Sequence, residues 1–285
     1  MIMPLESGTI AGAMTLDLID RTDRLGEQEV LPHLAIIEGI GHTSLSGEVN
    51  AYVQGKQKVA MGVGVETGHV RVPTVELEEW IAMMNDQPYT DAIIVEEPLP
   101  GCSRAETAVI LGMLDDNKAV DNQGPNRLWG MGATSEATVT LLDWHGHTGE
   151  GRHVLIVGDG KVGGPLANVY NSPERKVKDL SVVNIHNREK LPALALAADM
   201  VIVATGSPNT LTPDMVRKEH VIVGVGARDI HPDVRALTHT PFWVTPAKGG
   251  VGPLTIRTLL GRVVDLAEGK PPRHPFATQL AESMQ

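Results

Sequence analysis

The sequence lacks the features of proteins that sit in membranes or are built around disulfides. It has a single cysteine, Cys102, which excludes an internal disulfide and a cysteine-based metal cluster and is best explained as a small, half-buried residue. No run of about 18 apolar residues occurs, so no membrane span is expected. The N-terminal residues show no basic segment followed by an apolar one, so no cleaved secretory signal is expected. These absences predict a cytoplasmic protein.

Positive charge is also scarce. The chain has 24 Lys and Arg against 35 Asp and Glu, a formal net charge of -11. Nucleic acids and anionic membranes attract concentrated basic surfaces, so neither is an expected partner. Small-molecule chemistry is favoured instead, and an anionic substrate would need basic residues placed locally in its site.

Apolar residues are plentiful and periodic. The 285 residues, 42% of them hydrophobic, are enough for two ordinary domains. Helix-like and strand-like spacing alternate, which predicts an α/β fold with parallel sheets. We expect helices at 9–24, 48–63, 75–85, 162–170 and 254–267, and strands at 33–39, 92–95, 154–157, 181–185, 200–204 and 221–225. The expected domains are 1–140, with 254–285 packing back on it, and 141–253.

A glycine-rich loop directly follows the apolar strand at 154–157. Gly158, Gly160 and Gly163 have G-x-G-x-x-G spacing, and a helix is expected directly after them. The first glycine permits a tight turn, the second lets the backbone approach a pyrophosphate, and the third lets helix and strand pack closely. This context predicts a Rossmann-type NAD(P)-binding domain at 141–253; the alternative is a glycine-rich turn without a ligand. The expected cofactor-binding residues are Gly158, Asp159, Gly160, Lys161, Val162, Gly163, Asn187, Arg188, Thr205 and Gly206.

The end of the second strand of this domain bears on the choice between NAD and NADP. An NAD site usually has Asp or Glu there, bonded to the ribose hydroxyls. Here the segment His186-Asn187-Arg188 has no carboxylate, and Arg188 is suited to a 2′-phosphate. We therefore expect NADP, with NAD as the second choice. The alternative for Arg188 is a solvated arginine that opens the next helix.

Four further segments form an ordered set along almost the whole chain. They are YVQGK at 52–56, VEEPLP at 95–100, KAVD at 118–121 and TPAKGGVGPLT at 245–255. They resemble Y-V-x-x-K, V-Q-L-P-L-P, K-D-V-D and T-P-V-P-G-G-V-G-P-M-T of the bifunctional methylenetetrahydrofolate dehydrogenase/methenyltetrahydrofolate cyclohydrolase family, and G-G-V-G-P is the most specific match. The resemblance implies a folate-binding catalytic domain at 1–140, a tetrahydrofolate derivative as substrate, and a homodimer.

The resemblance also implies roles for single residues. Tyr52 would line the folate site, Lys56 would be the central catalytic residue, and Asp121 would hold the pterin ring. The loop residues at the cofactor and substrate cleft would be Gly250, Val251, Gly252 and Pro253. The spacing of Tyr52 and Lys56 agrees with this, because residues four apart on a helix share a face. Without the resemblance, a lysine is most often a solvated surface residue.

Glu96 and Glu97 are the most informative departures, since they replace the glutamine and leucine of V-Q-L-P-L-P. A lysine that activates water must spend time neutral, whereas a nearby carboxylate favours its ammonium form. We therefore place Glu96 in the catalytic site and expect hydrolysis of the methenyl product to be weakened or lost, while hydride transfer, which depends on positioning, survives. Alternatively, Glu96 or Glu97 acts as a general base or binds a different substrate. One of them, more readily Glu97, could also merely cap a turn or pair with a surface lysine.

Other departures are smaller. They are Gly224 for an aspartate, Lys248 for a proline, Ala133-Thr134-Ser135 for C-T-P, and a glycine loop shorter by one residue. His145 and His147 have a spacing seen in metal sites, but nothing nearby in the sequence completes one, so we predict a polar loop between domains and no metal.

The sequence thus predicts an NAD(P)-dependent methylenetetrahydrofolate dehydrogenase. The fully bifunctional enzyme is the nearest alternative, followed by a dehydrogenase for another pterin or small substrate. A noncatalytic relative that senses cofactor or scaffolds a partner is a third. The joint presence of Tyr52, Lys56 and Asp121 argues against the last, because a binding-only protein needs only the Rossmann part.

Overall fold

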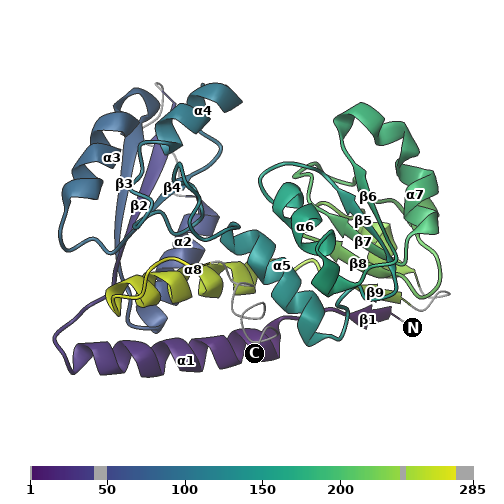
Figure 1. The fold of residues 1–285 in the computed structure, drawn as a ribbon, viewed down its shortest axis with the longest axis horizontal. Helices are drawn as coiled ribbons and strands as arrows, with labels where there is room; N and C mark the ends of the chain where they lie inside the picture. Colours follow the sequence, from purple (N-terminus) through teal and green to yellow (C-terminus); the bar gives the residue numbers. More distant parts are fainter. Residues whose placement is uncertain (1, 42–49, 238–241, 274–285) are drawn as a thin grey trace. The chain divides into compact units, whose positions relative to one another are not determined.

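The computed structural model describes residues 2–41, 50–237 and 242–273. The chain folds into two compact units, each built on a parallel sheet (Figure 1). The six-stranded unit comprises Met1–Gly12 and Thr134–Thr255, and the three-stranded unit comprises Ala13–Ala133 and Ile256–Gln285. The chain passes between the units inside α1 (Gly8–Gly26) and α8 (Val251–Ala267), and at the start of α5 (Ala133–Trp144).

The three-stranded sheet has the order β3-β2-β4, with all strands parallel. Its strands are β2 (His33–Ile40), β3 (Glu66–Pro73) and β4 (Ala92–Glu96), and the helices of this unit include α2 (Ala51–Gly62), α3 (Leu77–Asp86) and α4 (Arg104–Leu111). Alternate residues of β2 belong to different cores. Leu34 and Ile36 pack with residues of α2 and α8, whereas Ala35 and Ile37 pack with residues of α3 and α4. Both faces of this sheet are therefore covered, as its apolar strands require.

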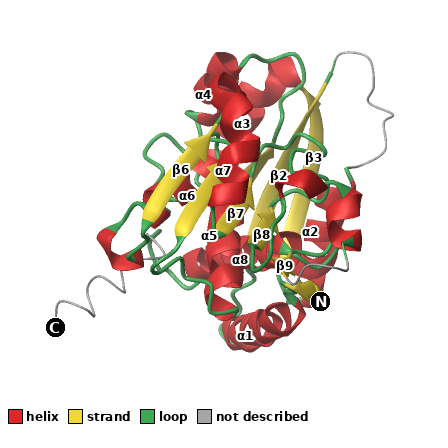
Figure 2. Cartoon of the chain, turned by 90° about the vertical axis from the view of Figure 1, so that its right-hand side faces the viewer, coloured by secondary structure: helices red, strands yellow, loops and turns green. Residues whose placement is uncertain are grey.

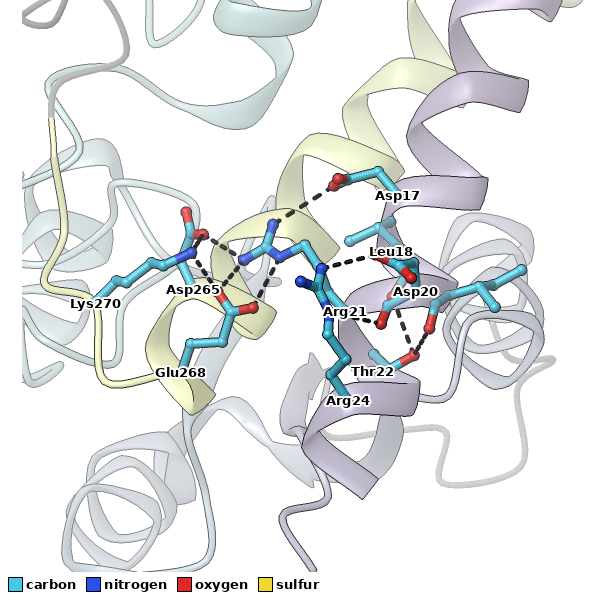
Figure 3. A network of polar contacts seen from close by, with 10 residues as sticks. Asp17, Leu18, Asp20, Arg21, Thr22, Arg24, Asp265, Glu268 and Lys270 are labelled. Atoms are coloured by element: carbon cyan, nitrogen blue, oxygen red, sulfur yellow. Dashed lines mark hydrogen bonds and ion pairs between the residues drawn. The ribbon is translucent and has the colours of Figure 1, made fainter. Parts of the chain in front are cut away.

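Helices α1 and α8 are joined in this unit by a network of charged side chains (Figure 3). Arg21 of α1 donates to Asp265 (Nη2 to Oδ1, 2.5 Å) and to both carboxylate oxygens of Glu268 (3.1 and 2.6 Å). Lys270 Nζ also lies 2.6 Å from Glu268 Oε2. The hydrogen bond from Arg21 lowers the pKa of Glu268 from its ordinary 4.5 to about 2. The network thus ties two helices far apart in the sequence.

The six-stranded sheet has the order β1-β9-β8-β7-β5-β6 and is parallel throughout. Its strands are β1 (Ile2–Pro4), β5 (His153–Val157), β6 (Asp179–Val183), β7 (Met200–Val203), β8 (Val221–Gly224) and β9 (Phe242–Val244), and Figure 2 shows several of them as yellow arrows. Helices α6 (Gly163–Tyr170) and α7 (Leu191–Ala197) follow β5 and β6. The strand order reverses between β5 and β7, and in parallel sheets ligands bind in the crevice at such a point. This is the Rossmann-type sheet expected from the sequence.

The structure adds elements that the sequence patterns do not predict. They are β1, β3, β9, α4, α5 and α7. The expected helix at 48–63 is described from Ala51, and residues 48 and 49 lie outside the described residues. The expected strand 181–185 begins earlier, at Asp179, and ends earlier, at Val183, because Asn184 caps the short 3-10 helix Ile185–Lys190.

The unit boundaries also differ from the expected domains. Residues 2–4 belong to the six-stranded unit because β1 pairs with β9, with Ile2 opposite Phe242. Within α8, Val251–Thr255 group with the six-stranded unit and the remainder with the three-stranded unit. Residues 274–285 of the segment expected to pack back lie outside the described residues. Among the described residues, every helix lacks the length or the apolar character needed to cross a membrane.

Candidate active site

Lys56 and Tyr52 lie one helical turn apart on α2. The helix begins after Asn50, whose side chain accepts a hydrogen bond from the Tyr52 backbone N–H at 2.9 Å. Lys56 is only 3% exposed, and its Nζ lies 4.6 Å from the centroid of the Tyr52 ring, a cation–π distance. Tyr52 itself is 40% exposed. The pair therefore has the common face that its spacing indicates, with the lysine inside and the aromatic ring reaching solvent.

Glu96 is the carboxylate partner of Lys56. It is the last residue of β4, is buried, and forms an ion pair and hydrogen bond with the Lys56 ammonium group. A buried charge is costly unless it is paired, and here each charge compensates the other. The structure thus brings Glu96 to Lys56, as expected from the departure at this position.

Gln123 organises the segment next to Glu96, a role that was not predicted from the sequence. Its amide group accepts from the Val95 N–H (3.0 Å) and donates to the Val95 carbonyl oxygen (2.7 Å) and to Glu97 Oε1 (3.0 Å). Glu97 is exposed, and the Glu97–Pro98 peptide bond is cis. The hydrogen bond from Gln123 gives Glu97 one partner within this segment. The only signal for Gln123 was its position two residues after Asp121.

Asp121 lies in the loop that leads into α5. It is half-buried, and its Oδ1 accepts a hydrogen bond from the Ala133 N–H at 2.9 Å. The same loop is held by Arg262 of α8, which donates to the carbonyl oxygens of Val120 (2.8 Å) and Met131 (3.0 Å). The Asp121 carboxylate is therefore fixed in orientation, and Lys56, Tyr52, Glu96 and Asp121 all belong to the three-stranded unit.

A second charged group on this sheet was also missed. Glu38 of β2 is the register partner of both Glu96 and Arg71, so their side chains emerge on the same face of the sheet. Glu38 Oε2 lies 3.1 Å from His69 Nε2 and 3.2 Å from Arg71 Nε. Adjacent like charges on neighbouring strands are destabilising, and here Glu38 and Glu96 each have cationic partners of their own. A lone glutamate within an apolar strand was the available signal.

The glycine loop of the six-stranded unit follows β5, at the crevice between β5 and β7. Gly158 has φ +104°, and a Cβ there would lie 2.5 Å from the Ala204 carbonyl oxygen at the end of β7. A Cβ on Gly163 would lie 1.8 Å from the Gly158 carbonyl oxygen, whereas a Cβ on Gly160 would meet nothing within 4 Å. Gly158 and Gly163 are thus required by the fold, and Gly160 faces open space. This cradle fits a dinucleotide pyrophosphate, as the spacing predicts.

The residue at the end of β6 is not the one predicted from the sequence. Asn184, rather than His186 to Arg188, follows the last residue of the strand. Asn187 folds back, accepting from the Asn184 N–H (2.6 Å) and donating to the Val182 carbonyl oxygen (3.2 Å). Arg188 is exposed, and none of the polar contacts described in the structure involves its side chain. Exposure of Arg188 agrees both with a ligand contact and with a solvated arginine, whereas the Asn187 side chain already serves the local turn.

The remaining expected cofactor residues lie on the two sides of the same crevice. Val162 precedes α6, and its carbonyl oxygen accepts a hydrogen bond from Ser135 Oγ at 3.1 Å. Lys161, the residue before it, is exposed. Thr205 and Gly206 follow β7, and Thr205 Oγ1 accepts from the Ser207 N–H at 3.1 Å. Asp229, which was not predicted, is 2% exposed and accepts from the Gly226 N–H at 2.9 Å. Burial raises the pKa of Asp229.

The second glycine segment forms the N-terminus of α8 in the six-stranded unit. Gly250 is buried, and Val251, Gly252 and Pro253 make the first turn of the helix. The loop is held by Ser7, whose N–H and Oγ–H both donate to the Gly249 carbonyl oxygen, at 2.9 and 2.8 Å. A Cβ on Gly224 would lie 2.8 Å from Ile230 Cδ1, which is a packing reason why no aspartate occupies that position here.

His145 and His147 lie directly after α5 and form no metal site with other described residues. His145 Nε2 lies 3.0 Å from the Glu6 carbonyl oxygen, and His147 packs edge-on against Trp243. Burial lowers the pKa of His147 from 6.5 to about 4. A buried neutral imidazole against an aromatic ring is a structural arrangement, and in place of the expected polar loop the structure gives a partly buried turn.

Two family models match the chain. Residues 5–121 match the catalytic domain of tetrahydrofolate dehydrogenase/cyclohydrolase, and residues 132–270 match its NAD(P)-binding domain. The boundary between the two matches falls in the loop that leads into α5, close to where the two compact units divide.

Individual proteins give the same answer. The bifunctional protein FolD of Aliarcobacter butzleri is 31% identical over 84% of this chain and 86% of its own length, and that of Lacticaseibacillus paracasei is 29% identical over 94% and 98%. The FolD crystal structure from Campylobacter jejuni has a TM-score of 0.78 at 24% identity, covering 94% of this chain and 99% of that one. The Trypanosoma brucei enzyme, complexed with NADP and an inhibitor, has a TM-score of 0.79 at 22% identity, covering 94% and 98%. The chain belongs to the tetrahydrofolate dehydrogenase/cyclohydrolase family.

Proposed function

We propose that the chain oxidises methylenetetrahydrofolate to methenyltetrahydrofolate with NADP as hydride acceptor. The observation that carries this proposal is the buried Lys56, packed on Tyr52 and paired with Glu96, in the region that matches the family's catalytic domain. Burying an ion pair usually brings little stability compared with apolar residues of the same volume. A chemical role therefore explains the pair better than a structural one.

The side chains of this region serve mainly to position the substrate. The exposed ring of Tyr52 offers an aromatic surface for the flat rings of a folate. The fixed Asp121 carboxylate is suited to accept hydrogen bonds from a pterin amino group and ring nitrogen. Lys56 donates hydrogen bonds to polar atoms of the substrate. NADP, when bound, supplies the hydride acceptor, and the amides of the loop at Gly158 to Gly163 are placed to bind its pyrophosphate.

The charge of the Lys56–Glu96 pair suits the oxidation step. Loss of a hydride leaves a positive charge on the methenyl product. An isolated ammonium group would repel that charge, whereas a lysine paired with a carboxylate contributes no net charge. Glu96 therefore supports hydride transfer, whichever way the second step proceeds.

Hydrolysis of the methenyl product is the second step, and two observations bear on it. The relatives named above are bifunctional proteins, which favours a chain that carries out both steps. The buried contact between Lys56 and Glu96 favours slow hydrolysis, because it occupies the lysine amine that would otherwise assist the attacking water. We propose that both steps occur and that hydrolysis is the slower one.

One time course tests these proposals. The purified chain is mixed with methylenetetrahydrofolate and either NADP or NAD, and reduced nicotinamide and methenyl product are followed together. Reduced cofactor with accumulating methenyl product supports a slow hydrolytic step. Reduced cofactor with little methenyl product supports the fully bifunctional enzyme and refutes our interpretation of Glu96.

The same assay separates the remaining alternatives. Binding of NADP without oxidation of any folate would support a noncatalytic cofactor-binding relative, and turnover of another pterin only would place the two glutamates in a different substrate site. The cytoplasmic homodimer expected from the sequence and the resemblance stays a prediction. Light scattering of the purified chain, coupled to size-exclusion chromatography, tests the dimer directly.

A further inference from the structure

The glycine loop brings a carboxylate to the end of β6. The Gly158 N–H donates to the carbonyl oxygen of Val183, the last residue of β6, at 2.7 Å. The next residue of each segment continues this contact, since Asn184 Nδ2 donates to Asp159 Oδ2 at 2.7 Å. The Asn184 carboxamide oxygen is used by the His186 N–H at 2.9 Å, which fixes the side chain from its other end. Asp159 is exposed to solvent, and the hydrogen bond from Asn184 fixes the orientation of its carboxylate.

This place has a defined meaning in Rossmann-type domains. The residue at the end of the second strand meets the ribose of the adenosine half, and an acid there bonds the ribose hydroxyls of NAD. The end of β6 carries an amide here, but that amide presents the carboxylate of Asp159. The end of β6 is therefore next to an acid that comes from the glycine loop and not from the strand.

The charges after β6 act in the opposite direction. His186, Arg188 and Lys190 are all exposed on the short helix Ile185–Lys190. Arg188 and Lys190 attract a 2′-phosphate, whereas a carboxylate within hydrogen-bonding reach of the ribose repels it. Selectivity for the phosphate is then a balance between Asp159 and these cations.

We propose that Asp159, held by Asn184, is a selectivity residue of the cofactor site that bonds the ribose hydroxyls and weakens binding of a 2′-phosphate, so that NAD competes with NADP. The inference rests on the proposed use of a nicotinamide dinucleotide. It concerns only the discrimination between the two dinucleotides and not the chemistry of the substrate.

Binding measurements test this inference independently of turnover. The dissociation constants of NADP, NAD and the fragment 2′,5′-ADP are measured by calorimetry for the full chain and for Asp159→Asn. Asparagine keeps the size and can still bond Asn184, but removes the charge. We expect the ratio of the NAD to the NADP dissociation constant to rise about tenfold, with 2′,5′-ADP bound correspondingly more tightly.

Two further variants sharpen the test. Asp179→Asn removes the same charge at the opposite end of β6 and should leave the ratio unchanged. Asn184→Asp keeps an oxygen for the His186 N–H but adds a carboxylate at the ribose position, and should move the ratio about tenfold towards NAD.

The outcomes separate this inference from the proposed function. If the chain binds both dinucleotides and Asp159→Asn leaves their ratio within a factor of about two, which is small against the expected change, the inference is refuted and the proposed function stands. If Asp179→Asn changes the ratio as much as Asp159→Asn, a general charge effect replaces the local one and the inference also fails. If the unaltered chain binds neither dinucleotide, the proposed function fails as well.

Discussion

The two units hold their candidate functional groups in opposite ways. In the six-stranded unit the cradle is made of backbone, with Gly158 and Gly163 packed against main-chain oxygens and Gly160 open. In the three-stranded unit the candidate site contains charged side chains, with Lys56 and Glu96 buried against each other. Added side-chain atoms disrupt a loop made of backbone, whereas removal of one charge leaves the other charge of a buried ion pair uncompensated. The two sites should therefore respond differently to matched substitutions.

The largest effect is expected in the three-stranded unit, from Lys56→Met. This variant leaves Glu96 as an unpaired buried carboxylate, which should lower the free energy of unfolding by about 3–5 kcal/mol and reduce folate oxidation by about a thousandfold. The double variant Lys56→Met/Glu96→Leu removes both charges and should regain most of the stability but none of the activity. Urea unfolding and the oxidation assay measure the two effects. If the Lys56→Met variant still oxidised folate at the normal rate, the proposed role of Lys56 would be contradicted.

The matched test in the six-stranded unit compares two glycines. Gly163→Ala would place a Cβ 1.8 Å from the Gly158 carbonyl oxygen, so we expect a loss of about 3 kcal/mol in unfolding free energy. Gly160→Ala meets open space, so stability should hold while NADP binding weakens by about tenfold or more, because the backbone can no longer approach the pyrophosphate. Urea unfolding and calorimetry separate the two. Equal destabilisation by both substitutions would show that Gly160 serves packing and not the cofactor.

The units should also differ in their response to acid. Burial lowers the pKa of both His147 and His220 in the six-stranded unit from 6.5 to about 4. Unfolding lets these imidazoles take up protons at a higher pH than the folded state does. The free energy of unfolding is therefore unaffected by them above pH 6.5 and decreases as the pH falls from 6.5 towards 4. The slope is at most about 1.4 kcal/mol per pH unit for each histidine. In the three-stranded unit, the pKa of Glu268 is lowered to about 2. The stability that Glu268 contributes is therefore lost only at lower pH, between pH 4.5 and about 2.

Hydrogen exchange resolved by peptide tests this difference. Between pH 7 and pH 5, after correction for intrinsic exchange, protection should fall in peptides from β7 and β8 and hold in those from β4 and from residues 256–267 of α8. The variant His147→Phe should reduce the fall in the six-stranded unit, because it removes one of the two groups that take up protons. Equal losses in both units over this range would argue against buried neutral histidines as the cause.

The smallest effect is expected at the network in Figure 3. Arg21→Met removes the hydrogen bonds to Asp265 and Glu268, which should cost about 1 kcal/mol and return the pKa of Glu268 towards 4.5. Arg24→Met is the matched control, since Arg24 and Asp20 form an exposed pair within α1 and their loss should change stability little. NMR titration of Glu268 and thermal unfolding measure the two effects. An unchanged Glu268 pKa in Arg21→Met would leave Lys270 as the main partner.

The sequence predicts the parts of both units that depend on local requirements. The glycine loop is recognisable because tight turns and close packing need glycine at fixed spacing, and Tyr52 and Lys56 share a face because the helix period places them there. The contact of Lys56 with Glu96 depends on how α2 lies against the sheet, which no local pattern contains. This contact was expected only because the chain resembles the family and has Glu96 where the family has glutamine.

Other features were missed for identifiable reasons. Strands β1 and β9 are only three residues each, which is too short for a periodicity. They form through pairing with distant strands, since β9 lies between β1 and β8 in the sheet. The apolar run through Ile185 suggested a longer β6, but the capping hydrogen bonds of Asn184 end it at Val183. Ser7 and Gln123 act on main-chain atoms of distant segments, so their own sequence surroundings carry no signal.

The pairing of β1 with β9 has a consequence for how the chain is made. Ile2 lies opposite Phe242, so the edge of the six-stranded sheet joins residues that are far apart in the sequence. The core of the three-stranded unit likewise includes Leu260 and Val264 of α8, which are synthesised late. During synthesis, neither unit completes its contacts until most of the polypeptide has left the ribosome. Such long-range closure slows folding and exposes apolar strands in the meantime, so this chain should depend on chaperones more than a domain of local contacts would.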